Sequence, residues 1–443
     1  MAYTHSIKKL LNIKDPNIHL AEIPVIKEKK KGQEYLVVHG KLTYRPSCCK
    51  VCGIKNSSYQ DLIKHGTKRS TLTLTHVNFQ PVLLRLKKQR FLCKHCDSTF
   101  IAETSLVDRH CFISNVIKAT IAMELKETQS MTLIAQHLSV SPPTVIRVMR
   151  QVAETLEPNK QELPQHLSID EFKSVKDVSG AMSFLFINAL THQLTNVVEN
   201  RQLPYLLDYF MRYPVEVRNK VQTVTMDMYS PYTQLVRDCF PHAKIIIDRF
   251  HIVQHMNRAL NSERIKVMKE MRYTRPRDYR KLKNQWKLVL KNEDDLDFSR
   301  YFTHRLYEGA VTEKMMADYL VQLDPKLERV YALFNQLKWA LEHHDFKRFK
   351  RYLKESKKYI LPRKARTVIK TFEKYLEPIK NAFIYTLSNG PIEGMNNKIK
   401  NIKRTGYGYR NFNNLRARIL VSYRLTASHY QPRTLYFEDK KAG

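Results

Sequence analysis

Three acidic residues, Asp170, Asp227 and Glu393, have the type and placement that metal-assisted phosphodiester chemistry requires. Asp170 and Asp227 end two predicted strands, and strand ends on one side of an α/β sheet bring side chains together in a crevice. Three carboxylates can hold two Mg²⁺ or Mn²⁺ ions about 3.5–4 Å apart. One ion activates a water or a 3′-hydroxyl and the other stabilises the leaving oxygen. The three acids therefore predict a site for phosphoryl transfer.

Glu393 lies in a segment, 388–400, that predicts a helix with one polar face. Ser388 or Asn389 can cap this helix. The polar face carries an acid and amides but no large apolar side chain, whereas a core helix would present the reverse. The residues on this face are Glu393, Asn396, Asn397 and Lys400. We expect Asn397 and Lys400 to be accessory to the acid.

A fourth acid, Asp248, follows the predicted strand 243–247 and is an alternative to Asp227 as the second of the three metal-binding acids. Asp248 could instead cap the next helix, or orient Arg249 or His251. Glu171, next to Asp170, should point to the opposite face of its strand because side chains alternate.

Two Cys-x-x-Cys pairs, Cys49 with Cys52 and Cys93 with Cys96, predict a structural zinc site. Tetrahedral Zn²⁺ needs four soft ligands, and each pair turns two sulfurs the same way. Predicted strands at 71–75 and 82–86 lie between the pairs. The strands and the two cysteine pairs together indicate a zinc ribbon. The gap between the pairs is longer than usual, and Cys48 could replace Cys49. Four reduced cysteines without a metal are the alternative.

Residues 112–155 predict a helix-turn-helix. Helical patterns over 114–127 and 131–138 precede a third helix that starts at Pro142, with Ser141 as its cap. The third helix would present Thr144 and Arg147 to the major groove of DNA. An ordinary bundle of linker helices is the alternative.

A basic segment with interleaved aromatic residues follows Glu393. Cations match phosphates, and aromatic rings can stack on unpaired bases near a cut. Gly406 and Gly408 permit a tight turn there. A basic surface loop packed by its aromatic residues is the alternative. The residues that we expect to contact DNA are Lys398, Lys403, Arg404, Tyr407 and Arg410.

The predicted elements between 166 and 270 have the order of a ribonuclease H-like fold: three strands, then helix, strand, helix, strand and helix. From 270 to 380 strand patterns end, which indicates an all-α insertion. We therefore predict a multidomain α/β protein. Its expected parts are 1–108 (N-terminal segment and zinc ribbon), 109–160 (helix-turn-helix), 161–270 (catalytic domain, first part), 271–380 (helical insertion), 381–425 (catalytic domain, last part) and 426–443 (polar tail).

The charge balance favours a nucleic-acid partner. The chain has 443 residues and a formal net charge of +34, spread along its length. Such a surplus suits a surface that binds a polyanion. We expect no membrane partner and a cytoplasmic location, because the chain has no apolar run of about 18 residues and no signal-peptide pattern at its start.

The chain resembles the DDE transposases of bacterial insertion sequences, specifically the ISL-three group. The motifs that carry the resemblance are IDEF at 169–172, MDMYSPY at 226–232, DRFH at 248–251, SNGPIEGMNNKIK at 388–400 and KRTGYGY at 403–409 with Phe412. The resemblance covers nearly the whole chain and implies that Asp170, Asp227 and Glu393 take the three catalytic acid positions. It also implies cleavage at terminal inverted repeats and joining of the 3′ ends to target DNA. The implied partners are double-stranded DNA and further copies of the chain, as a homodimer or larger assembly on the bacterial nucleoid.

Two other functions stay open at this point. A non-catalytic, sequence-specific DNA-binding regulator would need the zinc ribbon and the helix-turn-helix but not the three acids. A nuclease of the same fold would cleave DNA without joining it.

Overall fold

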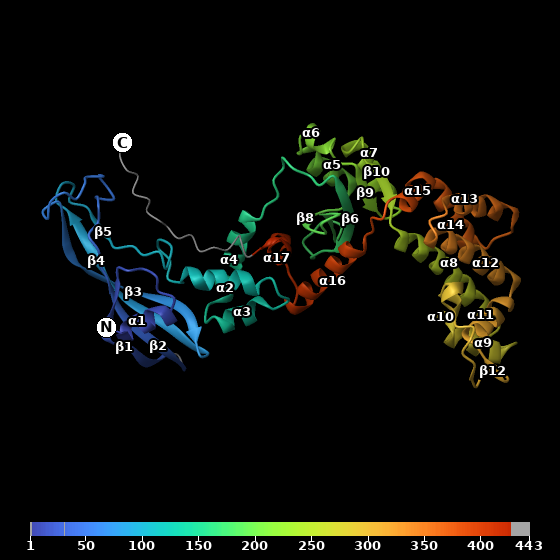
Figure 1. Cartoon of the computed structure of the whole chain (residues 1–443), viewed down its shortest axis with the longest axis horizontal. Coiled ribbons are helices and arrows are strands. Elements are labelled where there is room, and N and C mark those ends of the chain that lie inside the picture. Colours follow the sequence, from blue (N-terminus) through green and yellow to red (C-terminus); the bar gives the residue numbers. More distant parts are fainter. Residues whose placement is uncertain (1, 31, 427–443) are drawn as a thin grey trace. The chain divides into compact units, whose positions relative to one another are not determined.

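The computed structural model describes residues 2–30 and 32–426, so most of the predicted tail lies outside the described residues. The chain forms two units, which we call the N-terminal unit (Met1–Glu157 with Lys398–Gly443) and the central unit (Pro158–Asn397). Figure 1 shows both units, with elements labelled where there is room.

A five-stranded sheet opens the N-terminal unit. Its strands β1 to β4 lie in the order β1-β2-β4-β3, and the short β5 pairs with β4. On β4 every second side chain is buried (Val82, Leu84, Leu86), which is the alternation expected of a sheet with one covered face. The elements are α1 (Ala2–Leu10), β1 (Ile18–Lys30), β2 (Gln33–Leu42), β3 (Leu62–Val77), β4 (Gln80–Cys93) and β5 (Thr99–Ile101).

Four helices form a second core in the same unit. Three of them, α2 (Asn115–Glu124), α3 (Met131–His137) and α4 (Pro142–Thr155), are the predicted helix-turn-helix segment. The fourth is α17 (Phe412–Arg424), whose Ala417 and Val421 are buried with the apolar residues of the other three. The predicted last part of the catalytic domain ran to residue 425, but the chain leaves the central unit after Asn397. Periodicity shows that a helix has an apolar face but not which core that face joins.

A second five-stranded sheet organises the central unit, in the order β10-β9-β6-β7-β8. β7 is antiparallel to β6 and to β8, whereas β9 is parallel to both β6 and β10. Aromatic residues, among them Phe184 and Phe210, fill its core. The elements are β6 (His166–Lys173), β7 (Met182–Asn188), β8 (Leu194–Val198), α5 (Leu203–Met211), α6 (Val215–Arg218), β9 (Thr223–Met226), α7 (Ser230–Cys239), β10 (Lys244–Ile247) and α8 (Arg249–Glu270).

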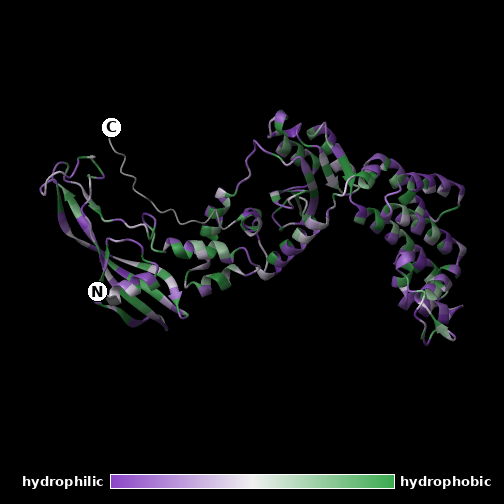
Figure 2. Ribbon diagram, viewed as in Figure 1, coloured by the Kyte–Doolittle hydropathy of each residue, from purple (hydrophilic) through white to green (hydrophobic). Residues whose placement is uncertain are grey.

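Helices dominate from 276 to 384, as the sequence predicts, and only the short hairpin β11–β12 interrupts them. Figure 2 shows hydrophobic and hydrophilic residues interspersed along the helices of the insertion. The elements are α9 (Pro276–Asn284), α10 (Trp286–Leu290), β11 (Phe302–Thr303), β12 (Ala310–Val311), α11 (Glu313–Gln322), α12 (Pro325–Glu342), α13 (Phe346–Glu355), α14 (Arg363–Lys374), α15 (Leu376–Ile384) and then α16 (Gly390–Thr405). In the described parts of the chain, no helix has both the length and the apolar character needed to cross a membrane.

Candidate active site and zinc site

The register of three neighbouring strands places three aspartates in one row. Strands β6 and β10 both pair in parallel with β9. Continuing these registers by one or two residues sets Asp170 and Asp248 beside Asp227, on strands about 4.8 Å apart. Asp227 is therefore the central acid of the row.

Helix α16 brings Glu393 to this row of aspartates, and the His251 side chain lies between Asp227 and Glu393. The Nε2 atom of His251 lies 2.6 Å from Oδ1 of Asp227 and 3.9 Å from Oε1 of Glu393. One ligand atom from each of Asp248, His251 and Glu393 can be chosen so that all three lie within 4.8 Å of one another. The structure thus brings together all four acids chosen from the sequence, with His251 among them.

Two asparagines of the segment 388–400 attach that segment to β6. The Nδ2 group of Asn396 donates to Oδ2 of Asp170 at 2.7 Å and to the carbonyl of Glu171 at 3.4 Å. Asn389 donates to the carbonyl of Ile169 at 3.3 Å. Sequence reasoning put Asn396 on the polar face but chose Asn397 and Lys400 as accessory residues, and those two side chains are exposed.

Glu171 points away from the acid row, as strand alternation requires. Its carboxylate accepts a hydrogen bond of 2.5 Å from the hydroxyl of Tyr232 and pairs with Arg201. This acid therefore has a structural partner on the other face of the sheet.

Burial and the charge of neighbouring acids disfavour the charged forms of Asp170 and Asp248. Burial, reinforced by the charge of Asp227, raises the pKa of Asp170 to about 7, although the N–H of Glu171 opposes the shift. Burial likewise raises the pKa of Asp248. For His251, burial alone would lower the pKa, but the hydrogen bond to Asp227 and the surrounding aspartates raise it above the ordinary value.

The residues present fit a divalent cation. Asp248 is only 2% exposed, and its Oδ2 accepts no hydrogen bond from the described residues. A buried carboxylate oxygen without a donor requires a proton or a cation. Hard carboxylate oxygens are also the ligands that Mg²⁺ prefers.

The four predicted cysteines converge at the other end of the chain. The sulfur atoms of Cys49 and Cys96 are 3.8 Å apart, and those of Cys52 and Cys93 are 3.7 Å apart. Four sulfurs each about 2.3 Å from Zn²⁺ form a tetrahedron with edges of about 3.8 Å, so the cluster fits zinc. Cys48 is exposed and does not belong to the cluster.

Local backbone contacts prepare one of these thiols for a metal. Burial would raise the pKa of Cys49, but the N–H groups of Cys52 and Val51, which donate to its sulfur, lower the pKa to about 6. A thiolate, not a thiol, is the form that binds the metal.

The residues expected to contact DNA differ in exposure. On α4, Arg147 is exposed, but Thr144 is 8% exposed and its hydroxyl lies 3.1 Å from that of Ser141. Thr144 therefore belongs to the start of the helix and is not available to a groove. Among the other expected contacts, Arg404, Tyr407 and Arg410 are exposed, and Lys398 and Lys403 are half-buried.

The turn after α16 depends on its glycines. A Cβ on Gly406 would lie 2.8 Å from the ring of Tyr409, and Gly408 has a φ of +92°. Tyr407 between them is 93% exposed. Arg418, a cation further along the same basic segment, is fully buried and donates to the carbonyls of Glu127 and Gln129.

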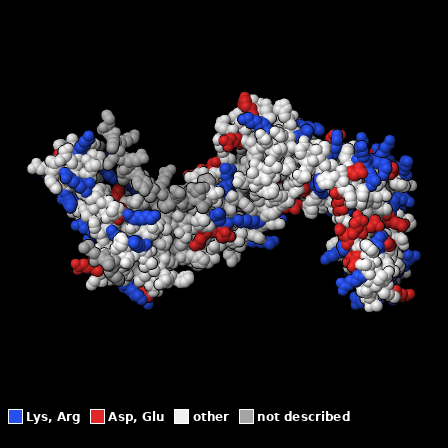
Figure 3. Space-filling view, in the orientation of Figure 1, with Lys and Arg blue, Asp and Glu red and all other residues white. Residues whose placement is uncertain are grey.

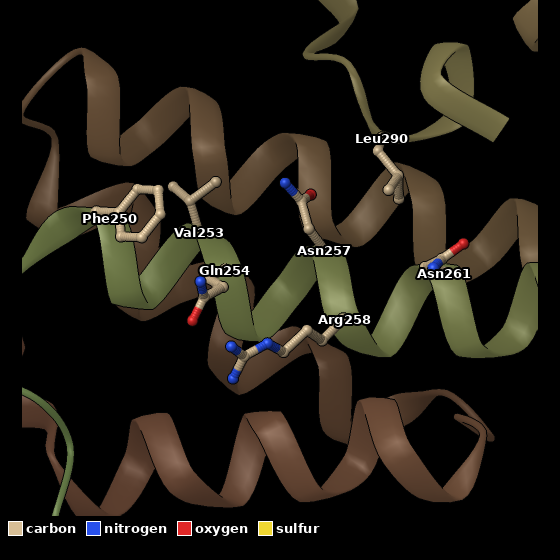
Figure 4. Close-up of a pocket in the computed structure, with 7 residues that line it drawn as sticks. All are labelled: Phe250, Val253, Gln254, Asn257, Arg258, Asn261 and Leu290. Carbon is tan, nitrogen blue, oxygen red and sulfur yellow. The ribbon is translucent and has the colours of Figure 1, made fainter. Parts of the chain in front are cut away.

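A surface groove of about 200 Å³ runs along α8, which starts at the acid row. Figure 4 shows Phe250, Gln254, Asn257 and Arg258 on this helix, with Leu290 across the groove. The groove is lined by apolar, amide and cationic groups, and none of the four acids is among its lining residues.

A comparison with protein families identifies the group to which this site belongs. A family model described as a transposase, of the ISL-three group of DDE transposases, matches residues 167–419. The match covers more than half of the 443 residues. The chain belongs to this transposase family. The resemblance inferred from the motifs is therefore confirmed, and the matched range contains all four acids, His251 and Asn396.

Two curated relatives give a consistent but uneven match. The transposase for insertion sequence element IS1001 of Bordetella parapertussis is 23% identical over 382 residues, which are 85% of this chain and 88% of that protein. A Lactococcus lactis subsp. lactis protein named as an ATP-dependent protease is 36% identical over 113 residues. That second match spans only 26% of this chain and 36% of the protein that it matches.

The sequence alone assigns no role at the site to Asn396, and it indicates His251 only as a group that Asp248 could orient. A signal existed: His251 follows Asp248 by three residues at the start of a predicted helix, which is the spacing that brings two side chains to one side.

Proposed function

We propose that this member of the transposase family binds the terminal inverted repeats of an insertion sequence, cleaves the DNA by metal-assisted phosphodiester hydrolysis and joins the 3′ ends to target DNA. The observation that carries the proposal is the acid row: Asp170, Asp227 and Asp248 side by side, with Glu393 brought in by α16. A regulator that only binds DNA has no need of such a row.

We propose a ribonuclease H-like fold for the sheet of the central unit. Support comes from its strand order, with β6 in the centre, and from its directions, since only β7 runs opposite to the others. The helical insertion then separates this sheet from α16, which supplies the last acid.

In this proposal Asp170, Asp227 and Glu393 hold the divalent ions, and Asp248 is an accessory ligand. Mg²⁺ or Mn²⁺, when bound, would activate the attacking hydroxyl and stabilise the leaving oxygen. The chain's own groups do the positioning: Asn396 holds Asp170 through a 2.7 Å hydrogen bond, and His251 holds Asp227 through a 2.6 Å contact. Both contacts restrict the carboxylates to the side of the sheet where the acids meet.

For the N-terminal unit we propose recognition of the element's ends. The four-cysteine cluster would hold a structural Zn²⁺ at one end of its sheet, and α2 to α4 would bind DNA as a helix-turn-helix with Arg147 at the bases. Cations of the second half of α16 and residues of the turn after it would also contact DNA: Lys398, Lys403, Arg404, Tyr407 and Arg410.

The helical insertion offers a second surface for DNA, or for another subunit. Lys and Arg gather over α13 and α14 (Figure 3). Their apolar sides are buried, so the cations cover the outer sides. Exposed cations of this surface include Lys347, Lys350, Lys354, Arg363, Lys364 and Lys370. Because two ends must be paired before joining, we expect a homodimer or a larger assembly on nucleoid DNA.

The test uses purified protein, Mg²⁺ and labelled duplexes that carry the sequences flanking this gene in its source. Wild type is compared with Asp170→Asn, Asp227→Asn, Asp248→Asn and Glu393→Gln. Asp238→Asn, an exposed acid on α7 of the same unit, is the matched control. DNA binding of each variant is measured separately by fluorescence anisotropy.

We expect cleavage and joining by wild type and by the control, and loss of both in the Asp170, Asp227 and Glu393 variants with binding retained. Binding without any cut by wild type would support the regulator instead. Nicks that never become joined products would support a nuclease. If Asp248→Asn abolishes activity while Asp227→Asn keeps it, the second acid of the triad is Asp248.

A further inference from the structure

The hairpin between β3 and β4 ends in an exposed aromatic side chain in an unfavourable backbone conformation. Val77 pairs with Gln80, so the turn consists only of Asn78 and Phe79, with φ values of 47° and 62°. Such two-residue turns strongly favour Asn followed by Gly, because both residues need a positive φ. Asn78 fits this preference, but a bulky residue in the second position is an outlier.

Neither local conformation nor burial explains why the second position is a phenylalanine. The side chain of Phe79 is 99% exposed, so it gains nothing from the core of the sheet. Glycine would be the better residue for the isolated hairpin. Backbone strain that the fold itself does not offset is the kind of outlier from which a functional contact can be inferred, and at this exposed tip the contact would lie outside the described chain.

Hydrogen bonds attach this end of the hairpin to the helix-turn-helix. The N–H of Thr73 donates to the carbonyl of Phe112, and the N–H of Ser114, the cap of α2, donates to the carbonyl of Thr73. Closer to the tip, Nε2 of His76 lies 3.0 Å from the hydroxyl of Ser139. Figure 1 shows β3 reaching from the β5 end of the sheet toward α3.

The position of Ser139 makes this attachment informative. Ser139 lies in the turn between α3 and α4, two residues before the cap of α4, and has a φ of 50°. Phe79 is three residues beyond His76, at most about 10 Å along an extended chain. The exposed aromatic tip therefore lies close to the start of the helix that we assign to the major groove.

Basic residues accompany the tip. β2 runs parallel to β4, so the end of β1 with Lys29 and Lys30 lies at the same end of the sheet as Phe79. Both lysines are exposed and make no ion pair within the described residues. The acids beside them are paired: Glu28 accepts two hydrogen bonds from Arg85, and Glu34 lies 3.6 Å from Lys27. Positive charge is therefore left over at this end, as contact with phosphates requires.

We propose that the β3–β4 hairpin is a DNA-binding wing that inserts Phe79 into the minor groove next to the major groove entered by α4. This inference rests on the proposed function, since it assigns a further contact to the same DNA. The centre of the adjacent minor groove lies about half of a 34 Å helical turn, or about 17 Å, from that of the major groove. Phenylalanine is one of the side chains that wedge between base steps from the minor groove and bend the duplex, and Lys29 and Lys30 would bind the flanking phosphates.

The test compares full-length wild type with Phe79→Gly, Phe79→Leu and the control Phe298→Ala, an exposed phenylalanine in the other unit. The probe is the labelled duplex with the flanking sequences of the gene. Affinity is measured by anisotropy, bending by energy transfer between dyes at the two ends, and thermal stability and oligomeric state for each variant. Netropsin, which occupies the minor groove, is added in a parallel series.

We expect Phe79→Gly to bind about 5- to 100-fold more weakly, with less bending, because aromatic contacts to bases contribute on that scale. Its thermal stability should equal or exceed that of wild type, since glycine suits the turn, so misfolding cannot account for the loss. Phe79→Leu keeps an apolar wedge and should retain part of the bend, and netropsin should weaken wild type more than Phe79→Gly.

Unchanged affinity and bending in Phe79→Gly would overturn the wing while leaving the proposed function intact. A changed oligomeric state with unchanged DNA binding would assign the tip to a second copy of the chain and would also overturn it. If wild type does not bind the duplex at all, the proposed function fails first and the wing fails with it.

Discussion

Replacing Asn396 by alanine tests whether this residue positions Asp170 for the proposed reaction. Asn396 is buried, and its Nδ2 donates to Oδ2 of Asp170 at 2.7 Å. A hydrogen bond to a charged group contributes about 1.5–3 kcal/mol. If Asn396 selects the orientation of Asp170 that binds a metal, its loss should weaken that orientation by about 10- to 100-fold.

The matched control is the neighbour on the same helix, Asn397→Ala, because that side chain is exposed. Cleavage of the labelled duplex is measured as a function of Mg²⁺ concentration, and thermal stability is recorded for each variant. For Asn396→Ala we expect a lower rate and a midpoint for Mg²⁺ about tenfold higher or more. Asn397→Ala should stay within about threefold of wild type.

A purely structural role for Asn396 would lower stability without moving the Mg²⁺ midpoint. The reasoning is refuted if Asn396→Ala retains the wild-type midpoint, or if Asn397→Ala loses more activity than Asn396→Ala. A larger loss of activity in Asn397→Ala would instead support the prediction from the sequence, in which Asn397 and not Asn396 assists Glu393.

Three further predictions concern other parts of the chain. Metal analysis should find zinc bound to wild type and to Cys48→Ser but not to Cys93→Ser. The Cys93→Ser variant should also unfold at a lower temperature. Retention of zinc by Cys93→Ser would exclude the four-cysteine site. Burial lowers the pKa of Lys338 from 10.5 to about 8. As the pH rises, the folded state therefore loses this proton before the unfolded state does, and the free energy of unfolding of wild type should rise between pH 8 and 10.5. Lys338→Met should therefore stabilise the fold by about 2 kcal/mol at pH 7, a figure that already subtracts the loss of the 3.3 Å hydrogen bond to the carbonyl of Leu290. At pH 10 the gain should be smaller, because the lysine of the folded wild type is then neutral. Denaturant titrations at both pH values measure the gain, and an equal gain at the two would contradict this reasoning. Lys350→Ala combined with Lys354→Ala should lower the salt slope of DNA binding by about 2, and an unchanged slope would remove α13 from the DNA-binding surface.

The sequence places two of the acids at strand ends because the residues before them follow a regular pattern. Buried strands lead to Asp227 and Asp248, so periodicity places both residues at strand ends without any knowledge of the tertiary structure. The two Cys-x-x-Cys pairs carry equally local information, since each pair forms one turn. The order of strands and helices between 166 and 270 is likewise recovered from pattern alone.

What pattern could not reveal depends on contacts between distant segments. The hydrogen bond between Asn396 and Asp170 joins residues 226 positions apart. Arg418 looks like one more cation in a basic segment, yet its guanidinium is buried against the carbonyls of Glu127 and Gln129. Thr144 has the residue type and helix position of a groove contact, but it is buried at the start of α4.

The competition between Asp227 and Asp248 shows how geometry changes a question that the sequence leaves open. Taken one at a time, both aspartates end a strand, and each is a plausible second acid. The register shows that they are neighbours in one row with Asp227 in the centre. The central acid can share an ion with Asp170 on one side and with Asp248 on the other.

Their surroundings separate the two acids further. Asp227 already has a cationic partner, because His251 lies 2.6 Å away and its pKa is raised. Asp248 is more deeply buried, and its Oδ2 accepts no hydrogen bond from the described residues. Burial raises the pKa of the Asp248 carboxyl, but the backbone N–H groups of Asn389 and of Phe250, in the first turn of α8, oppose this shift, so this acid also caps its helix. Oδ1 of Asp227 and Oδ2 of Asp248 are both buried oxygens that could take a cation, so Asp248 can serve as an additional ligand, while the strand register keeps Asp227 at the centre of the row.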